Sequence, residues 1–384
     1  MVNLRGAFPP AFLWGAATSA HQIEGDNSNN DAWAAEHDPK SAFVEVSGSA
    51  CDSYHRFGED ISIVASLGLN AYRFSLEWSR IEPQPGDFSI AALGHYREMI
   101  LRCLEEEVTP VVTLHHFTNP RWVAEMGGWT STQVVERFAN YCERVIPILA
   151  EVDTVCTINE PNVLAGWAHL LARPPVSAPG DRVRDNLMAA HHRARDILRA
   201  DRPRRVGLTL AMNAWEILPG GEEQAARLFG DSEDWYLSQL ADDDFVGVQT
   251  YTSNVVDASG LVAPDASEPT TLTGWRIRPR AVAEAVRRAH STTGLAVLVT
   301  ENGIATDDDD LRSRYIEEAL ASLAEVVADG IPLGGYFHWS LLDNFEWLHG
   351  YRPTFGLVAV DRQSFARREK PSARRYAELI RSVR

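Results

Sequence analysis

Short apolar segments alternate along the chain with segments whose apolar residues recur every three or four positions. The apolar segments lack the polar alternation of a half-exposed sheet, which is typical of strands that are buried on both faces. Within residues 90–107, Leu93, Tyr96, Ile100 and Leu104 form the stripe of a helix that faces a core. The pattern therefore predicts buried strands that alternate with amphipathic helices.

The predicted strands lie at residues 12–18, 71–78, 110–114, 155–158, 206–212, 245–251, 296–300 and 335–340. Helices are predicted at 57–67, 90–107, 132–149, 186–200, 224–240, 279–289 and 372–383, and in a segment striped by Ile316, Leu320, Leu323 and Val327. The polar residues from 19 to 52 and from 252 to 273 are predicted to be loops.

Repeated strands and helices of this kind favour an α/β fold with a parallel sheet, and eight repeats predict a closed (β/α)8 TIM barrel. An open, doubly wound sheet is the competing arrangement. It is disfavoured because no glycine-rich turn follows the first strand to mark a dinucleotide site. We expect residues 1–384 to form a single domain with its active site at the C-terminal ends of the strands.

The composition excludes several classes of function. Hydrophobic residues make up 45% of the 384 residues and charged residues 23%, as in a globular protein with a large core. The net charge of -17 argues against nucleic acid or an anionic membrane as a partner, whereas a neutral small molecule is compatible with it. No apolar segment approaches the length of a membrane span or a secretory leader, so we expect a cytoplasmic protein, with homo-oligomers left open.

Two glutamates stand where predicted buried strands end. Glu301 follows the apolar residues 298–299 and precedes a turn, and Glu160 follows Asn159 and precedes Pro161. A carboxylate rarely interrupts a buried strand without a partner or a chemical role. For either glutamate alone, a structural role as a helix cap or as the partner of an arginine explains the position as well as a chemical role does. Together they indicate paired acid/base and nucleophile chemistry.

Polar and aromatic side chains collect at the same predicted strand exits. They are Gln22, Arg73, Trp78, His115, His116, Asn159, Glu160, Tyr251, Glu301, Trp339, Glu346 and Trp347. Flat tryptophans stack on the apolar face of a pyranose, and amides, imidazoles and carboxylates hydrogen-bond its hydroxyls. Core packing is the alternative for Trp339 and Trp347. The set as a whole indicates a sugar site.

Arg73 and Tyr251 suggest how two carboxyls in one site could differ. A carboxylate that attacks an anomeric carbon must be ionised, and a nearby arginine and phenol lower its pKa and orient it. The other carboxyl must hold a proton, and burial and the charge of its partner raise its pKa. Such a pair supports the retaining cycle of glycoside hydrolysis.

No metal or cofactor is expected. Adjacent histidines such as His115 and His116, or His191 and His192, lack the spacing of a ligand set. The acidic residues Asp307–Asp310 resemble a calcium loop only in charge, and we expect them to cap the following helix. The four cysteines show no metal-binding spacing and are expected to be reduced core residues; they are Cys51, Cys103, Cys142 and Cys156.

Several motifs together resemble glycoside hydrolase family 1, whose members are mostly retaining β-glucosidases and related β-glycosidases. They are FLWGAATSAHQIEG at residues 12–25, YRFSLEWSR at 72–80, TINEP at 157–161, TENG at 300–303 and GYFHWSLLDNFEWLHG at 335–350. The resemblance covers nearly the whole chain. It implies a retaining exo-β-glycosidase, most simply a β-glucosidase acting on small β-glycosides or oligosaccharides without a cofactor.

The resemblance also implies roles for individual residues. Glu160 would be the acid/base and Glu301 the nucleophile, with Arg73 and Tyr251 supporting Glu301 and Asn159 contacting the sugar 2-hydroxyl. Trp339 would form the platform under the glycone. The positions that bind the remaining hydroxyls are matched by Gln22, His116, Glu346 and Trp347. Glu160 is not the glutamine of the thioglucosidase branch, and Glu346 argues against a phosphorylated glycone.

Departures from the family pattern concern the outer part of the site. Gln249 stands where asparagine is usual, Phe117 where tryptophan is common, and the segment between Pro219 and Phe245 is shorter than in most members. We therefore expect an open leaving-group side. Two other functions remain: a transglycosylase that uses the same site, and a sugar-binding barrel without activity.

Overall fold

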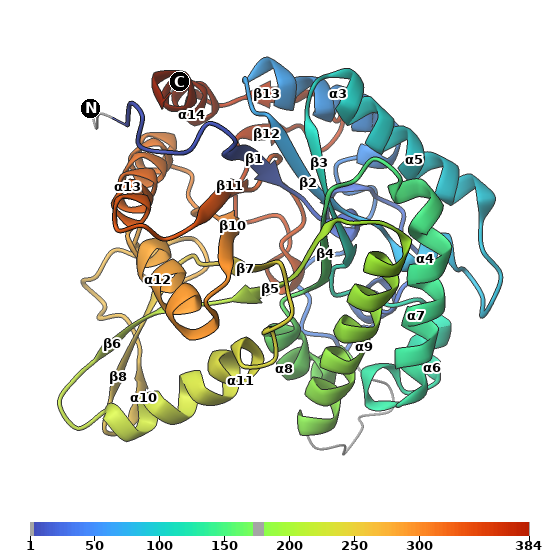
Figure 1. The fold of residues 1–384 in the computed structure, drawn as a ribbon, viewed down its shortest axis with the longest axis horizontal. Coiled ribbons are helices and arrows are strands. Elements are labelled where there is room, and N and C mark those ends of the chain that lie inside the picture. The colour runs from blue at the N-terminus through green and yellow to red at the C-terminus, as the bar shows by residue number, and fades with distance from the viewer. Residues whose placement is uncertain (1–3, 172–179, 384) are drawn as a thin grey trace.

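Eight parallel strands close into a barrel in the computed structural model, which describes residues 4–171 and 180–383 (Figure 1). The barrel strands are β1 (Leu13–Ala17), β2 (Ala71–Ser75), β3 (Thr109–His115), β4 (Thr154–Asn159), β5 (Arg205–Ala211), β7 (Phe245–Gln249), β10 (Ala296–Asn302) and β11 (Leu333–Trp339). Their order around the barrel is β1-β11-β10-β7-β5-β4-β3-β2. The predicted (β/α)8 fold is confirmed.

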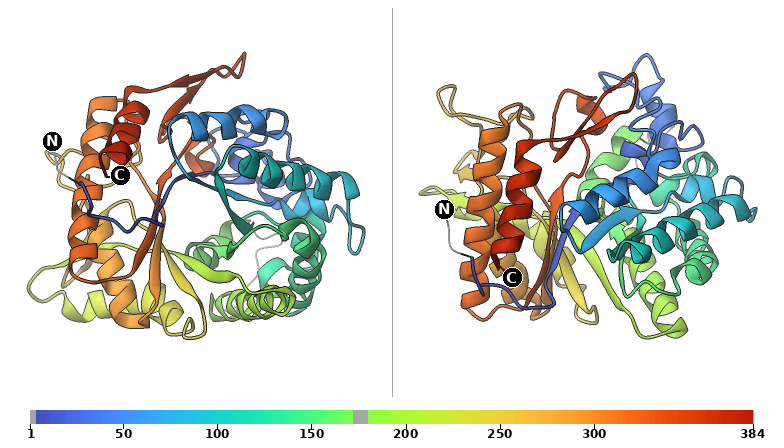
Figure 2. Two further views of the ribbon diagram at one scale, coloured as in Figure 1. Left: turned by 45° about the horizontal axis from the view of Figure 1, so that its top comes forward. Right: turned by 90° about the horizontal axis from the view of Figure 1, so that it is seen from above.

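Helices cover the outside of the barrel (Figure 2). The longer ones are α3 (Ser53–Ser66), α5 (Ile90–Glu105), α7 (Gln133–Val145), α9 (Gly180–Asp201), α12 (Ala281–Thr293), α13 (Asp309–Ala328) and α14 (Pro371–Val383). Between β5 and β7 the helical elements are short: α10 (Glu222–Phe229), a π-helical turn (Gly230–Asp234) and α11 (Trp235–Leu237). Helix formation there is weaker, as the less regular apolar pattern at 224–240 predicts.

The apolar core has two parts because each strand is buried on both faces. The larger part lies between the strands and the helices and contains residues such as Leu114, Val155 and Val246. The smaller part fills the barrel interior, with Val111 and Phe337 among its members. This double burial explains why the strand segments read as continuous apolar runs.

Two segments predicted to be loops contain regular structure. Residues 19–52 include α1 (Ala20–Ile23) and α2 (Asp31–Glu36), and residues 252–273 include β8 (Ser253–Asp257) and β9 (Gly260–Val262). These elements are too short for a clear period in the sequence. With β6 (Ala214–Ile217), β8 and β9 form a small three-stranded sheet beside the barrel.

Further short elements lie in the connections between barrel strands or near the end of the chain. They are α4 (Trp78–Ile81), α6 (Arg121–Glu125), α8 (Pro161–Leu171), β12 (Val358–Val360) and β13 (Arg367–Glu369). Strand β2 ends at Ser75, so the predicted strand 71–78 is too long. Trp78 starts a helical turn instead of closing a strand.

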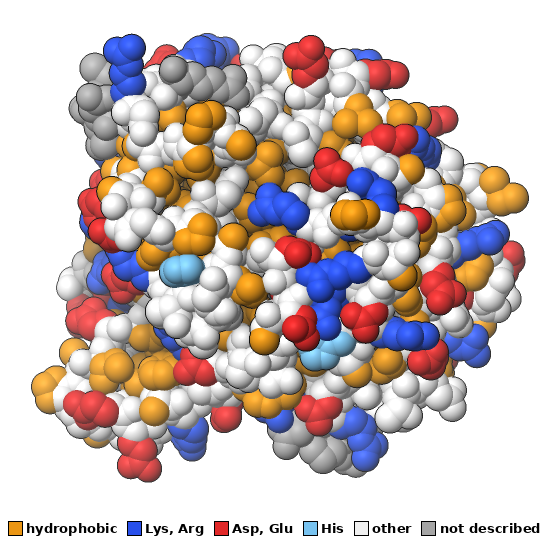
Figure 3. Space-filling view, in the orientation of Figure 1, with side chains coloured by type: hydrophobic (Ala, Val, Ile, Leu, Met, Phe, Trp, Pro, Cys, Tyr) orange, Lys and Arg blue, Asp and Glu red, His pale blue; other side chains and the backbone are white. Residues whose placement is uncertain are grey.

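The surface carries no large region of one charge on the face shown in Figure 3, where acidic and basic side chains lie next to one another. Among the described residues, no helix has both the length and the apolar composition needed to cross a membrane.

Candidate active site

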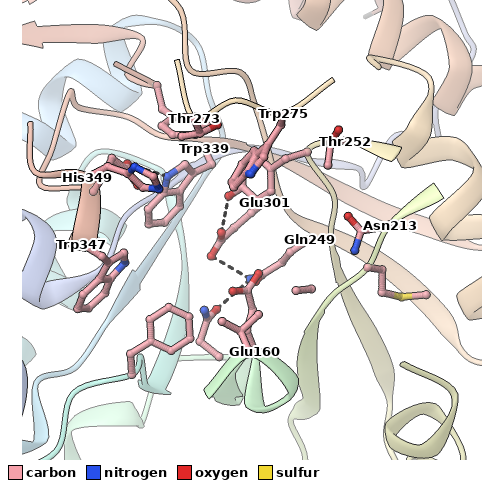
Figure 4. Close-up of a pocket in the computed structure, with 18 of the residues that line it drawn as sticks. Glu160, Asn213, Gln249, Thr252, Thr273, Trp275, Glu301, Trp339, Trp347 and His349 are labelled. Atoms are coloured by element: carbon pink, nitrogen blue, oxygen red, sulfur yellow. Dashed lines mark hydrogen bonds between the residues drawn. The ribbon is translucent and has the colours of Figure 1, made fainter. Parts of the chain in front are cut away.

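A cavity of about 370 Å³ opens where the barrel strands end (Figure 4). In a (β/α)8 barrel, the loops at this end carry the catalytic groups. The predicted site residues that line it are Gln22, His116, Asn159, Glu160, Tyr251, Glu301, Trp339, Glu346 and Trp347. Arg73 is fully buried in the barrel interior and reaches the cavity only through its hydrogen bonds.

Three donors hold the carboxylate of Glu301. Oε1 accepts hydrogen bonds from Arg73 Nη1 at 2.6 Å and from Gln249 Nε2 at 2.9 Å. Oε2 accepts one from Tyr251 Oη, also at 2.6 Å. Hydrogen bonds to an ionised group are shorter and stronger than neutral ones and fix its orientation. The arrangement presents Glu301 to the cavity as an oriented, charge-stabilised group.

The turn after Glu301 brings the end of β10 against the end of β11. A Cβ atom at Gly303 would lie 1.9 Å from the carbonyl oxygen of Trp339. Only glycine allows so close an approach of two backbones. Gly303, two residues after Glu301, therefore lets the end of β10 lie against the backbone of Trp339.

Glu160 is positioned by its backbone. Its φ of 41° lies in the left-handed region, which costs a residue with a side chain about 1–3 kcal/mol. Its N–H donates to Thr209 O at 2.9 Å, and its carbonyl accepts from the Val163 and Leu164 amides at 3.0 and 2.9 Å. Pro161 begins α8, where its missing N–H costs nothing.

The two glutamates differ in electrostatic surroundings. Burial raises the pKa of Glu160 well above its ordinary value, the charge of Glu301 raises it further, and Arg73 lowers it. Among the described residues, no side chain donates a hydrogen bond to the Glu160 carboxyl. Burial also raises the pKa of Glu301, but Arg73, Tyr251 and Gln249 all act against that rise.

The net pKa of Glu301 is thus raised, which differs from the expectation that Arg73 and Tyr251 bring it down. Desolvation outweighs them because the carboxyl is almost fully buried. Because three donors stabilise its charged form, Glu301 loses its proton at lower pH than Glu160 does. Glu160 keeps its proton to higher pH.

A polar network continues from Glu301 to His116. Three donors converge on Asn159 Oδ1: Arg73 Nη2 at 2.5 Å, Gln249 Nε2 at 2.9 Å and Thr209 Oγ1 at 3.1 Å. The Asn159 amide nitrogen then faces His116 Nε2 at 3.3 Å and donates to it. Burial, followed by the charge of Arg73, lowers the pKa of His116 well below its ordinary value, so the ring is neutral.

The proton of the neutral His116 ring therefore sits on Nδ1. Within the described part of the chain, this buried nitrogen has no hydrogen-bond partner, and neither does Gln249 Oε1. A buried donor and a buried acceptor without partners are costly unless a ligand satisfies them. Hydroxyl groups can do both, because each hydroxyl donates and accepts.

One side of the cavity combines aromatic planes with a third carboxyl. Trp339 Nε1 donates to Glu346 Oε1 at 3.2 Å, and Gln22 Nε2 lies 3.4 Å from Glu346 Oε2. Burial raises the pKa of Glu346 to about 8, although Trp339 lowers it. The rings of His116 and Trp339 are nearly parallel, at 15° with centroids 5.9 Å apart, and His116 and Trp347 differ by 8°. Parallel rings with a polar edge suit a pyranose.

The opposite side of the cavity is built from loops that the sequence did not single out. In Figure 4, Asn213 and Thr252 lie across Glu160 from Trp347. Trp275 stands at the mouth with 38% of its surface exposed. Other lining residues missed by the sequence analysis are Val163, Ala211, Met212, Asn254, Thr273, Leu348, His349 and Phe355. The sequence offered one signal for this side of the cavity: Trp275 lies just after the predicted polar loop 252–273.

Two residues predicted at the strand exits do not reach the cavity. Trp78 packs against Tyr141 and donates its Nε1 proton to Glu82 at 2.7 Å. His115 points to the other face of β3 and hydrogen-bonds Asn119 at 3.0 Å. Successive residues of a strand face opposite sides, so His116 reaches the cavity and His115 does not.

The other charged motifs serve the fold. Asp308 caps α13, its side chain accepting from the Leu311 amide at 3.0 Å. The buried His191 lies between Thr157 and Asp243. Over the residues that the structure describes, no three His, Cys, Asp or Glu side chains converge as metal ligands, and the four cysteines are free and buried.

The whole chain is similar to a known enzyme family. Residues 4–247 and 227–384 match the family model described as glycosyl hydrolase family 1. The two matches overlap at residues 227–247, which include most of the short segment between Pro219 and Phe245. Beta-glucosidase A of Thermotoga maritima is 31% identical over 439 aligned residues, which cover 98% of each protein.

Solved structures give the same result. The beta-glycosidase BGL167 is 40% identical, with a TM-score of 0.93 and 98% of each chain covered. A beta-glucosidase from Thermotoga maritima in complex with glucoimidazole is 30% identical, with a TM-score of 0.90; the match covers 98% of this chain and 99% of the other.

Proposed function

Because the chain belongs to glycosyl hydrolase family 1, we propose that it is a retaining exo-β-glycosidase and that terminal β-D-glucosyl groups are its substrates. One observation carries the mechanism. Glu160 and Glu301 line one cavity, and only Glu301 is held by an arginine, a tyrosine and a glutamine. Relatives that match nearly the full chain are named beta-glucosidases, which supports glucose as the glycone.

In the first step, the Glu301 carboxylate attacks the anomeric carbon as the bond to the leaving oxygen breaks. Glu160 gives its proton to that oxygen, and a glycosyl ester forms on Glu301. The charge on Glu301 is then gone, so the pKa of Glu160 falls and it can act as a base. It takes a proton from water, the water oxygen attacks the anomeric carbon, and Glu301 leaves as a carboxylate.

The glycone is proposed to lie between Trp339 and the polar groups around it. Asn159 would contact the 2-hydroxyl, and the remaining hydroxyls would bind Gln22, His116, Glu346 and Trp347. No lysine or arginine is among the described residues that line the cavity, so nothing there offsets the charge of a phosphate. An unphosphorylated sugar follows.

We also propose that residues 1–384 act as one domain. The first and last barrel strands support this, since Leu13 of β1 pairs with Gly335 of β11 and Gly6 N donates to Val383 O at 3.2 Å. A cytoplasmic location and homo-oligomer formation stay predictions.

The proposal is tested with a set of nitrophenyl β-glycosides followed by β-linked oligosaccharides. We expect the β-glucoside to be hydrolysed and NMR to detect β-glucose as the first product. α-Glucose as the first product would rule out retention, and no release from any glycoside would leave only a sugar-binding role. The ratio of free glucose to nitrophenol separates hydrolysis from transglycosylation, because a glycosyl group transferred to an alcohol is released as a new glycoside and not as free glucose.

A further inference from the structure

Glu233 is a buried acid that the chemistry of the two catalytic glutamates does not use. It lies in the π-helical turn Gly230–Asp234, and its side chain is 1% exposed although Asp234 beside it is 41% exposed. Burial raises the pKa of Glu233 to about 7, while Arg288 lowers it. A carboxyl buried in a surface turn needs partners to offset its desolvation.

The partners of Glu233 come from two distant parts of the chain. Oε1 accepts from the backbone amide of Asn213 at 3.2 Å and from Trp215 Nε1 at 3.1 Å. Oε2 forms an ion pair with Arg288 of α12. The carboxylate thus ties the loop after β5 to a helix of the barrel wall.

The same turn is also attached to the helix that follows Glu160. Asn162, two residues after Glu160, donates through Nδ2 to Ser232 O at 3.0 Å and to Ala211 O at 2.7 Å. Asn162 therefore links this turn to the end of β5 through the helix that follows Glu160. Asn162 bonds Ala211, and Glu233 bonds the amide of Asn213. These two contacts flank Met212, and both Met212 and Asn213 line the cavity.

This wall lies on the leaving-group side. Asn213 and Thr252 are separated from Trp339 and Trp347 by the two glutamates in Figure 4. A glycone bound at the tryptophans would direct its leaving group toward Asn213.

On the basis of the proposed function, we propose that Glu233 is a positioning residue for the leaving group. It holds the loop of Met212 and Asn213 at a fixed distance from Glu160, and so determines how tightly the leaving group binds. The glycone side does not depend on it, because within the described residues no contact of Glu233 reaches Trp339, Glu346 or Gln22.

The test compares Glu233→Ala with Asp234→Ala, since Asp234 pairs with the same arginine but does not contact the loop. We expect Glu233→Ala to raise KM for a β-linked glucose disaccharide about tenfold, the loss of roughly one good hydrogen bond. The inhibition constant of glucoimidazole, which resembles only the glycone, should stay within about twofold of wild type. Asp234→Ala should change neither value.

Two further variants keep the test decisive. Glu233→Gln keeps an acceptor for Asn213 and Trp215 and should restore most of the wild-type KM. Trp215→Phe removes one donor to Glu233 and should raise the disaccharide KM by a smaller factor. This variant tests the proposal even if Glu233→Ala does not fold. The proposal is overturned if inhibitor and disaccharide weaken equally in these variants, or if neither changes. A wild-type protein without hydrolytic activity would instead contradict the proposed function.

Discussion

Glu160 and Glu301 share one cavity but differ in what surrounds each carboxyl. Glu301 lies near the end of β10 and accepts hydrogen bonds from Arg73, Tyr251 and Gln249. Glu160 sits just beyond a strand in a left-handed conformation, and burial and the charge of Glu301 dominate its pKa. The difference shows how one residue type can supply both a nucleophile and an acid.

The comparison also shows where rigidity is needed. A nucleophile must stay ionised and aimed at one carbon, so donors on both oxygens are useful. An acid/base residue must exchange protons with a leaving oxygen and with water, so permanent donors would only compete with them.

The largest effect is expected from Glu301→Ala. Turnover should fall nearly to zero, because no carboxylate is left to form the glycosyl ester. Added azide should enter the vacated space and attack an activated β-glucoside from the α face. NMR should then identify an α-glucosyl azide, and a β-azide product would contradict the assigned roles.

Glu160→Ala should have a smaller effect that depends on the leaving group. Alkyl glycosides and disaccharides should lose about 10²–10⁴-fold in kcat/KM, the usual contribution of general acid catalysis. Dinitrophenyl glucosides need little protonation and should lose much less in the first step. Azide should here give a β-glucosyl azide. Equal losses on both substrate classes would show that Glu160 is not the acid.

Tyr251→Phe tests one of the donors to Glu301. Losing a hydrogen bond to a charged group should lower kcat/KM by roughly 10–100-fold. The acid limb of the pH–rate profile should move to higher pH, since Tyr251 lowers the pKa of Glu301. Tyr376→Phe is the control, because its buried hydroxyl bonds Gly15 O outside the cavity. A similar pH shift in both variants would argue against a specific role.

The smallest effect concerns stability. Glu160 has a folded pKa above its ordinary 4.5, so the folded state holds the proton more tightly and stability falls as pH rises through that window. Glu160→Gln removes this loss and should raise Tm near neutral pH by about 2–4 °C, with no gain below pH 4.5. The exposed Glu223→Gln is the control. An equal gain at both pH values would exclude the linkage.

Much of the barrel could be predicted because its signals are local. Residues 296–299 are all apolar since both faces of their strand are buried, and the stripe from Ile316 to Val327 marks one helix face. The short strands β6, β8 and β9 could not, because three to five residues carry no readable period. His115 was misplaced because one residue decides which face of a strand a side chain takes. Trp78 was misplaced because β2 ends at Ser75 and a helical turn begins at Trp78.

The sequence by itself determined the alternation of strands and helices, the two glutamates at strand ends and the family. These depend on burial patterns and on short motifs, which are properties of neighbouring residues. The tertiary structure decided which glutamate receives three donors, and that desolvation leaves both pKa values raised. It also decided that Glu233 reaches Asn213, Trp215 and Arg288 at once. Those facts depend on distances between residues far apart in the chain, and on an exclusion of water that only the closed barrel creates.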